Sequence, residues 1–379
     1  MRSLGRADPR RTRLAPSVGA IGLVASLLVA ACGPTAAPPR AAGESAAGTH
    51  GQASAAASAD PGAAPAPASD AAAPSTPAPL ALRIAYATPE ASMTPLWFAQ
   101  DHGYLREYGL DAELTFLSSG RTDQGVITGE TPVGFGANVI TSRLGGGDIV
   151  AIAGVVNRLP FTLFAQPGIG SVQDLRGKTI LTSSPGAIGS WATLMALRHL
   201  GLDPQRDVSL QPTGGINEKM ALMAQGLGDA TIFSPPGDLK AAELGLVPLF
   251  DLATMGVPAQ VTAIGTSQAY ARDHAEELRR VLRAYVAAVA QIRRDPEAAK
   301  AIIAKYTQTD DPAIVDHSYD YYRDVWGRPD FRVPPEAVQS ILDVLDVPGA
   351  ATARPADFVD NHFVDELEQA GFMRQVGAD

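Results

Sequence analysis

Short apolar runs that alternate with helix-type stretches, beginning near residue 81, constrain the fold of this chain most. The run ALRIAYAT at 81–88 precedes a helix-type stretch at 94–109, and a second apolar run, DAELTFL, follows at 111–117. Three more strand-type runs come next, at 132–136, 148–156 and 161–166. Parallel strands need crossover connections of this length, so the alternation predicts α/β units.

The alternation repeats after residue 170, with the strand-type runs KTILTS, DVSLQP, ATIF and VPLFDL between helix-type stretches. Beyond QVTAIGT the chain becomes helical, with apolar residues at the spacing of one helix face: Leu278, Leu282, Tyr285, Val289 and Ile292. The pattern fits two domains, or two lobes joined by crossings near 165–167 and 254–259. We assign 81–165 with 256–379 to lobe 1, and 166–255 to lobe 2.

The first 80 residues have a different character. Five arginines precede the apolar run 14–31, which predicts a signal peptide over 1–31; an uncleaved anchor is the alternative, since the run approaches the length of a membrane span. LVAACG at 28–33 resembles a bacterial lipobox, in which Cys32 would carry the lipid. Residues 32–80, rich in Ala, Pro and Ser, are expected to form a disordered tether.

Composition and motifs exclude several classes of function. The formal charge of −10 argues against a nucleic-acid surface, because binding phosphates requires a basic patch. The six histidines are scattered and the cysteine is single, so no metal site or cofactor is expected. The segments GKT at 177–179 and GAIGS at 186–190 lack the spacing of a phosphate-binding loop and of a nucleophile elbow. No catalytic residue is therefore predicted.

Four segments carry a family resemblance: PLWFAQDHGYLREYGLDAELTFLSSGR, SVQDLRGKTILTSSPGAIGSWATLMALRHLGLDPQRDV, MALMAQGLGDATIFSPPGD and FVDNHFVDELEQAGF. Together they resemble extracytoplasmic solute-binding proteins of ABC importers, in the nitrate, sulfonate, taurine and thiamine-precursor group. The resemblance extends over about 82–372. It implies a bilobed periplasmic-binding-protein fold, in which two α/β lobes are joined by hinge crossings and a ligand cleft lies between them.

The resemblance also implies partners and a location. The expected partners are a small-molecule solute and an ABC permease with its ATPase subunits. The protein is expected to be an exported monomer. Its lipid anchor would hold it at the membrane, on the periplasmic or extracellular face.

The pocket of this family agrees with a physical rule, that open α/β sheets bind ligands beyond the carboxyl ends of their strands. In the first lobe the rule and the neighbouring helix starts select Thr88, Glu90, Ser92, Met93, Thr94, Trp97, Ser119, Gly120, Arg121, Asn138 and Asn157. In the second lobe they select Ser183, Ser184, Gly186, Ser190, Trp191, Gly215, Ser234 and Pro235.

Several candidates have a second interpretation. Arg121 suits a sulfonate, nitrate or carboxylate, but it also suits a solvated helix start. Glu90 could pair with an ammonium group or face solvent. Trp97 and Trp191 could stack on a ligand ring or pack in the core. The segment 316–326 is expected to be a half-exposed helix face, and it could instead contribute a surface that contacts the permease.

The predicted function is capture of a small polar or anionic solute, sulfonate-, nitrate- or thiamine-precursor-like, and its delivery to a permease. Two alternatives remain: an enzyme on the same fold, resembling pyrimidine-precursor synthases, and a ligand-sensing domain of a membrane receptor. The histidine and cysteines that such synthases place near the cleft do not occur in the predicted loops.

Overall fold

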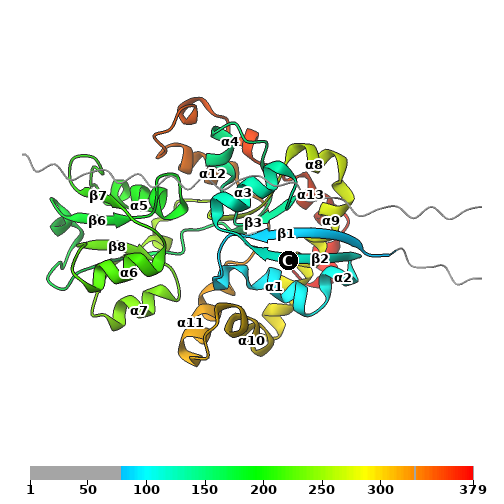
Figure 1. Cartoon of the computed structure of the whole chain (residues 1–379), viewed down its shortest axis with the longest axis horizontal. Helices are drawn as coiled ribbons and strands as arrows, with labels where there is room; N and C mark the ends of the chain where they lie inside the picture. Colours follow the sequence, from blue (N-terminus) through cyan, green and yellow to red (C-terminus); the bar gives the residue numbers. More distant parts are fainter. Residues whose placement is uncertain (1–77, 328–329, 379) are drawn as a thin grey trace, which may run out of the picture. The chain divides into compact units, whose positions relative to one another are not determined.

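Two five-stranded sheets organise the described residues, 78–327 and 330–378, of this computed structural model. The first has the strand order β2 (Leu110–Phe116), β1 (Leu80–Tyr86), β3 (Val133–Phe135), β10 (Thr262–Thr266) and β4 (Val150–Val156). The second has the order β7 (Ser209–Pro212), β6 (Thr179–Thr182), β8 (Ala230–Phe233), β5 (Thr162–Ala165) and β9 (Val247–Asp251). Figure 1 shows helices packed around each sheet.

One strand in each sheet runs against the other four. In the first sheet β10 pairs antiparallel with β3 and β4, and in the second β5 pairs antiparallel with β8 and β9. Each is the first strand after the chain crosses from the other sheet. Because the chain leaves one sheet at the carboxyl ends of its parallel strands, it enters the next at the equivalent edge and must run the opposite way.

The helices connect and cover these strands. Around the first sheet they are α1 (Thr94–Asp101), α2 (Tyr104–Glu107), α3 (Ser119–Thr128), α4 (Val139–Leu144), α8 (Gln268–Asp273), α9 (Ala275–Arg294), α10 (Pro296–Thr307), α11 (Pro312–Tyr322), α12 (Pro335–Leu342), α13 (His362–Gln369) and α14 (Phe372–Val376). Around the second they are α5 (Ile188–His199), α6 (Ile216–Ala224) and α7 (Gly237–Glu243). Short 3₁₀ turns lie at Ala91–Met93, Val172–Leu175, Leu252–Met255, Ala350–Thr352 and Pro355–Phe358.

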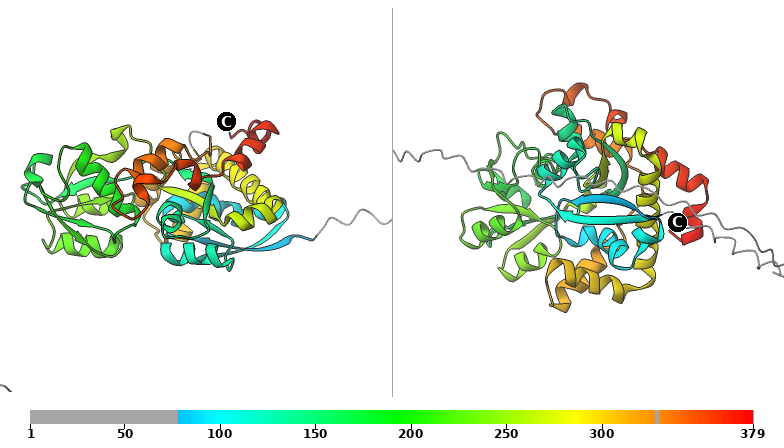
Figure 2. Two further views of the ribbon diagram at one scale, coloured as in Figure 1. Left: turned by 90° about the horizontal axis from the view of Figure 1, so that it is seen from above. Right: turned by 45° about the vertical axis from the view of Figure 1, so that its right-hand side comes forward.

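Helix α9 is the main support of the first lobe. The five apolar residues predicted to share one face, Leu278 through Ile292, are all buried, so that prediction is confirmed. The helix contacts α1, α2 and α10, and the C-terminal helices α13 and α14 pack along it, as Figure 2 shows in both views. The chain end thus closes the outer layer of the first lobe.

The second sheet buries both of its faces. Along β5 and β6, Leu163 and Ile180 belong to the main core, whereas their neighbours Phe164 and Leu181 pack in a smaller cluster on the opposite face, as strand alternation requires. Helix α6 covers that smaller cluster with Met223 and its partly buried neighbours. The packing fixes the rotation of α6 about its axis, and this rotation decides where Lys219 points.

The bilobed α/β fold predicted from the sequence is confirmed, with one difference at the first crossing. β5 pairs in the second sheet, so the chain changes sheets within 157–161, before the predicted crossing at 165–167 and within the segment assigned to lobe 1. It returns within 252–261, which includes the predicted second crossing.

The predicted signal peptide, Cys32 and most of the tether lie outside the described residues. Within the part of the chain that the structure describes, no helix is long and apolar enough to span a membrane.

Candidate functional site

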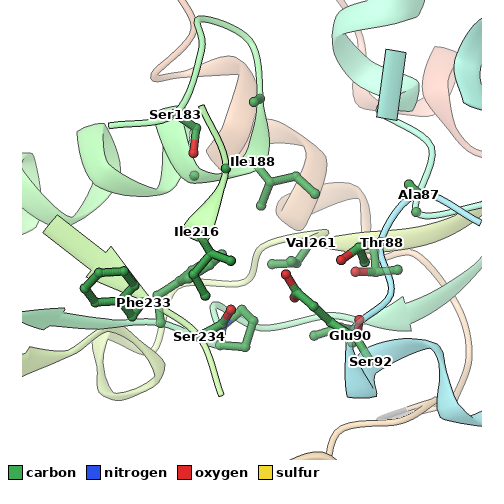
Figure 3. A pocket seen from close by; sticks show the side chains of 18 of the residues that line it. Ala87, Thr88, Glu90, Ser92, Ser183, Ile188, Ile216, Phe233, Ser234 and Val261 are labelled. Carbon is green, nitrogen blue, oxygen red and sulfur yellow. The ribbon is translucent and has the colours of Figure 1, made fainter. Parts of the chain in front are cut away.

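A cavity of about 260 Å³ lies at the carboxyl ends of strands from both sheets. Its walls include Ala87 and Thr88 after β1, Gly136 after β3, Ser183 after β6 and Ser234 after β8. Figure 3 shows Thr88, Glu90 and Ser92 on one side of this space and Ser183, Phe233 and Ser234 on the other. The strand-end rule thus identifies the correct edge of each sheet.

The first lobe contributes a carboxylate. Glu90 follows β1 and directly precedes the 3₁₀ turn that carries Ser92 and Met93, and its carboxylate points into the cavity (Figure 3). Burial raises the pKa of Glu90, whereas a hydrogen bond with Thr88 and the positive charge of Lys219 act to lower it. Burial is the larger effect, so the carboxylate lacks a partner strong enough to offset its desolvation.

The second lobe contributes an ammonium group. Lys219, in the first half of α6, is only 5% exposed, and its Nζ donates a hydrogen bond to the carbonyl oxygen of Ile232 at 3.2 Å. Nζ also lies 5.8 Å from the ring centroid of Phe233. Burial lowers the pKa of Lys219 to about 8, against the attraction of Glu90, which raises it. The side chain therefore remains mainly protonated at neutral pH.

Two helix starts face the same space. Ala187, Ile188 and Gly189 at the start of α5 line the cavity, as do Gly215 and Ile216 at the start of α6. Neither helix has a side chain that caps its first backbone N–H groups. These N–H groups and the positive ends of the two helix dipoles add to the charge of Lys219, so this wall attracts an anion.

Gly189 permits the close packing of that wall. A Cβ built on Gly189 would lie 2.4 Å from Oγ of Ser183 and 3.8 Å from Nζ of Lys219. A real side chain cannot approach an oxygen so closely, so any larger residue would displace Ser183. Glycine at this position thus lets a hydroxyl, an ammonium group and a helix start gather around one small volume.

Tyr322, the last residue of α11, closes the cavity from the first lobe. Burial raises the pKa of its phenol well above the usual value, with a further increase from the charge of Glu90. The hydroxyl therefore stays neutral and can donate or accept a hydrogen bond.

The structure brings seven of the predicted site residues to the cavity: Thr88, Glu90, Ser92, Met93, Ser183, Gly215 and Ser234. Three more, Asn138, Gly186 and Trp191, line an adjoining cavity of about 30 Å³, which shares Ile188 and Val261 with the larger one. The loop of Asn138 is held by Asp123, whose Oδ1 accepts a hydrogen bond from the Asn138 backbone at 2.8 Å.

Thr94, Trp97 and Asn157 make internal contacts and line neither of these two cavities. The hydroxyl of Thr94 donates to the carbonyl of Ala91 at 2.7 Å, and Nδ2 of Asn157 donates to the carbonyl of Arg332 at 2.9 Å. Trp97 is fully buried, with its ring stacked on that of Tyr306 at 4.7 Å between centroids. For Trp97 the core interpretation matches the packing.

Gly120, Arg121, Ser184, Ser190 and Pro235 also line neither cavity. Ser119 begins α3, and Gly120 and Arg121 are exposed in its first turn, which agrees with a solvated helix start. Oγ of Ser184 is 3.5 Å from the carbonyl of Thr213, and the backbone N–H of Ser190 donates to the carbonyl of Ala187 at 2.9 Å. Pro235 precedes Pro236 through a cis peptide bond.

Sequence reasoning missed Lys219, Tyr322 and most of the apolar wall, which includes Phe161, Ile188, Ile216, Phe233 and Val261. A signal for Lys219 existed, because it follows Ile216 by three residues and precedes Met223 by four, so it shares their helix face. Tyr322 lies in the segment 316–326, where half of the side chains face the core and Tyr322 itself is 1% exposed.

The chain was compared with protein-family models, with proteins of curated function and with solved structures. A family model described as NMT1/THI5 like matches residues 90–299. No protein of curated function matches the chain.

Several solved structures are similar. The alkanesulfonate-binding protein SsuA from Xanthomonas axonopodis pv. citri, bound to MOPS, aligns with a TM-score of 0.54 and 20% identity over 65% of this chain and 85% of that one. SsuA from Escherichia coli, an aliphatic sulphonate binding protein, gives 0.56 and 22% over 65% and 84%. The periplasmic nitrate-binding protein NrtA from Synechocystis PCC 6803 gives 0.59 and 13% over 77% and 89%.

Proposed function

This chain belongs to the NMT1/THI5-like family, and from that premise we propose that it is the solute-binding component of an ABC import system. Its fold is that of periplasmic binding proteins, as the likeness to SsuA and NrtA shows. In this proposal the cavity captures a small polar or anionic solute and the protein presents it to the permease and its ATPase subunits. The alkanesulfonate, sulphonate and nitrate ligands named for the similar structures suggest the class.

One observation carries the proposal, namely the anion-attracting wall in the second lobe. Lys219 and the starts of α5 and α6 surround a common volume, and the hydroxyls of Ser183 and Ser234 lie in the same wall. Oxygen atoms of a sulfonate, nitrate or carboxylate accept hydrogen bonds from such groups. A thiamine-precursor-like heterocycle would instead use the hydroxyls and the aromatic side chains Phe161 and Phe233.

The walls come from both lobes, which suits a hinge mechanism. A solute held between them would stabilise whichever lobe arrangement gives contacts on both sides, and the crossings at 157–161 and 252–261 would absorb the motion. Delivery to a membrane partner would then depend on the lobe arrangement that the solute selects.

Capture is favoured over catalysis by the chemistry of the walls. Among the described residues that line the cavity, the charged groups are one carboxylate and one ammonium, and neither histidine nor cysteine is present. The pyrimidine-precursor synthase alternative relies on those two residue types. The proposal also includes a monomeric protein that is attached to the membrane through Cys32, on the periplasmic or extracellular face. Cys32 lies outside the described residues.

The test uses the full chain with Cys32→Ser, which prevents lipidation. Native mass spectrometry followed by denaturation should release a stoichiometric small molecule from the purified protein. Isothermal titration with ethanesulfonate and nitrate should then show binding that Lys219→Met weakens by roughly ten- to a hundred-fold, as loss of a charge-assisted hydrogen bond predicts. Lys240→Met, which changes an exposed lysine on α7, serves as the control. A protein that carries no ligand and binds no member of the panel would contradict the proposal.

A further inference from the structure

We propose that the cavity selects a zwitterionic solute, whose ammonium group lies beside Glu90 of the first lobe and whose oxyanion lies beside Lys219 of the second. The inference rests on the proposed solute-binding function and specifies the class of solute. It follows from the placement of charge around the cavity, from the space between the charges and from the nature of the walls that separate them.

Opposite charges enter the cavity from opposite lobes. Glu90 follows β1 of the first sheet, whereas Lys219 belongs to α6 of the second, and these two are the charged side chains among the described residues that line the cavity. Figure 3 shows the Glu90 carboxylate directed across the open space toward the wall that holds Ile216 and Ser234. The site is therefore polarised along the direction that joins the two lobes.

The two charges attract each other without contact. Each influences the pKa of the other, yet they form no ion pair within 4.0 Å in the described structure. The Lys219 ammonium instead donates to the carbonyl of Ile232. Both groups thus retain hydrogen-bonding capacity toward the space between them, and a ligand with its own two charges could satisfy both.

Electrostatic reasoning distinguishes three kinds of solute. A simple anion gains from Lys219 and the helix starts but brings negative charge toward Glu90 and displaces the water that solvates it, which is costly for an unpaired carboxylate. A simple cation meets the reverse problem at Lys219. A zwitterion pairs with both groups, so its binding leaves neither charge buried without a partner.

The orientation follows from the helices. The starts of α5 and α6 add positive potential on the side of Lys219, whereas Glu90 provides the negative side. The oxyanion must therefore face the second lobe. A bound zwitterion would touch both lobes through its two ends, so the same charges that select it would also favour the lobe arrangement that binds it.

Size and wall chemistry narrow the class. About 260 Å³ corresponds to roughly nine water volumes, slightly below the range of drug-sized sites. Met93, Phe161, Ile188 and Val261 supply apolar surface in the walls. Such a space suits a short hydrocarbon spacer between the two charged groups, as in a small aminoalkyl sulfonate or amino acid.

The experiment compares matched solutes on the full chain carrying Cys32→Ser. Isothermal titration with 2-aminoethanesulfonate and ethanesulfonate measures the contribution of the ammonium group, and the same pair with a three-carbon spacer covers a second charge separation. β-Alanine with propionate distinguishes a carboxylate from a sulfonate. We expect at least one zwitterion to bind ten-fold or more tightly than its amine-free counterpart.

A variant pair assigns that preference to its residue. Glu90→Gln should reduce the ratio of affinities for zwitterion and anion to within three-fold of unity while leaving the affinity for the anion equal or higher. Glu113→Gln, an exposed carboxylate on β2, should leave the ratio unchanged. A thermal melt of each variant verifies that it is folded.

Each contrary result is distinguishable. Equal binding of zwitterions and their amine-free counterparts by the wild-type chain, or a preference that survives Glu90→Gln, would overturn the zwitterion inference and leave solute capture intact. Failure of every solute to bind the wild-type chain would overturn both the inference and the proposed function.

Discussion

Replacement of Lys219 by Met is expected to stabilise the empty protein while weakening solute binding. Burial lowers the pKa of Lys219 from its ordinary 10.5 to about 8. A difference of about 2.5 pKa units between the unfolded and folded states corresponds to about 3 kcal/mol, because each unit is worth about 1.4 kcal/mol. That free energy opposes folding whenever the buried ammonium is charged.

The free-energy penalty of burying the Lys219 ammonium decreases as the pH rises. Below pH 8 Lys219 is protonated in both states, so the folded protein carries the full penalty. Between pH 8 and 10.5 the folded state releases its proton first, and the penalty falls from about 3 kcal/mol at pH 7 to about 1 kcal/mol at pH 10. Above 10.5 both states are neutral at this site and the penalty vanishes.

Methionine matches the length of the lysine stem but removes the charge. The variant also loses the hydrogen bond to the carbonyl of Ile232, which offsets about 1 kcal/mol of the gain. The net stabilisation at pH 7 is therefore about 2 kcal/mol. For roughly 300 folded residues, each with an unfolding entropy of about 2.1 cal/mol/K, this is equivalent to an increase in melting temperature on the order of 3 °C.

The assay is urea denaturation of the wild-type chain, Lys219→Met and the surface control Lys240→Met, each at pH 7 and pH 10. The difference in unfolding free energy between Lys219→Met and wild type should shrink by about 2 kcal/mol at the higher pH, because other titrating groups cancel in the comparison. A difference that is unfavourable at pH 7, or that does not change with pH, would refute the account of Lys219 as a buried cation retained for binding.

Three further predictions concern other parts of the site. Gly189→Ala should weaken solute binding about ten-fold or more in titration calorimetry, because the Cβ of the new alanine would lie 2.4 Å from Oγ of Ser183. Gly120→Ala should leave the affinity unchanged, because a Cβ at that position meets no atom within 4 Å. Trp97→Ala should lower the unfolding free energy in urea by about 3–5 kcal/mol, because the side chain is fully buried in the core. The solute affinity of the folded variant should stay within two-fold of wild type, and a selective loss of binding would contradict this prediction. His317→Ala should weaken binding by roughly two- to five-fold, because Nε2 of His317 on α11 lies 2.8 Å from Oδ2 of Asp238 on α7 and joins the lobes. Unchanged affinity in titration calorimetry would mean that this contact does not bias the lobe arrangement.

The site residues that directly follow strands could be predicted from the sequence. Thr88, Glu90, Ser183 and Ser234 could be selected because each follows an apolar run, and the carboxyl ends of parallel strands meet at one edge of a sheet. The same rule also selected Arg121, which lies in the exposed first turn of α3. Order along the chain identifies a loop, but it does not say which of its side chains turns toward the cavity.

Helix residues of the site were harder to predict. Lys219 follows Glu218, which is exposed, and the local sequence INEKMALMA permits either residue to face solvent. Packing of α6 on the cluster that contains Met223 turns Lys219 inward toward Ile232. Tyr322 likewise reaches the cavity through the position of α11, which contacts α10 and the 3₁₀ turn after Glu90.

The sequence by itself determined the alternation of strands and helices, the apolar helix face from Leu278 to Ile292 and the polar loops at the strand ends, because these depend on local periodicity. Only the tertiary structure decided the reversed strands β5 and β10, the burial of Trp97 against Tyr306 and the opposition of Glu90 and Lys219 across the cavity. Glu90 and Lys219 belong to different lobes and lie far apart in the chain, and no local pattern records which distant side chains will share one buried space.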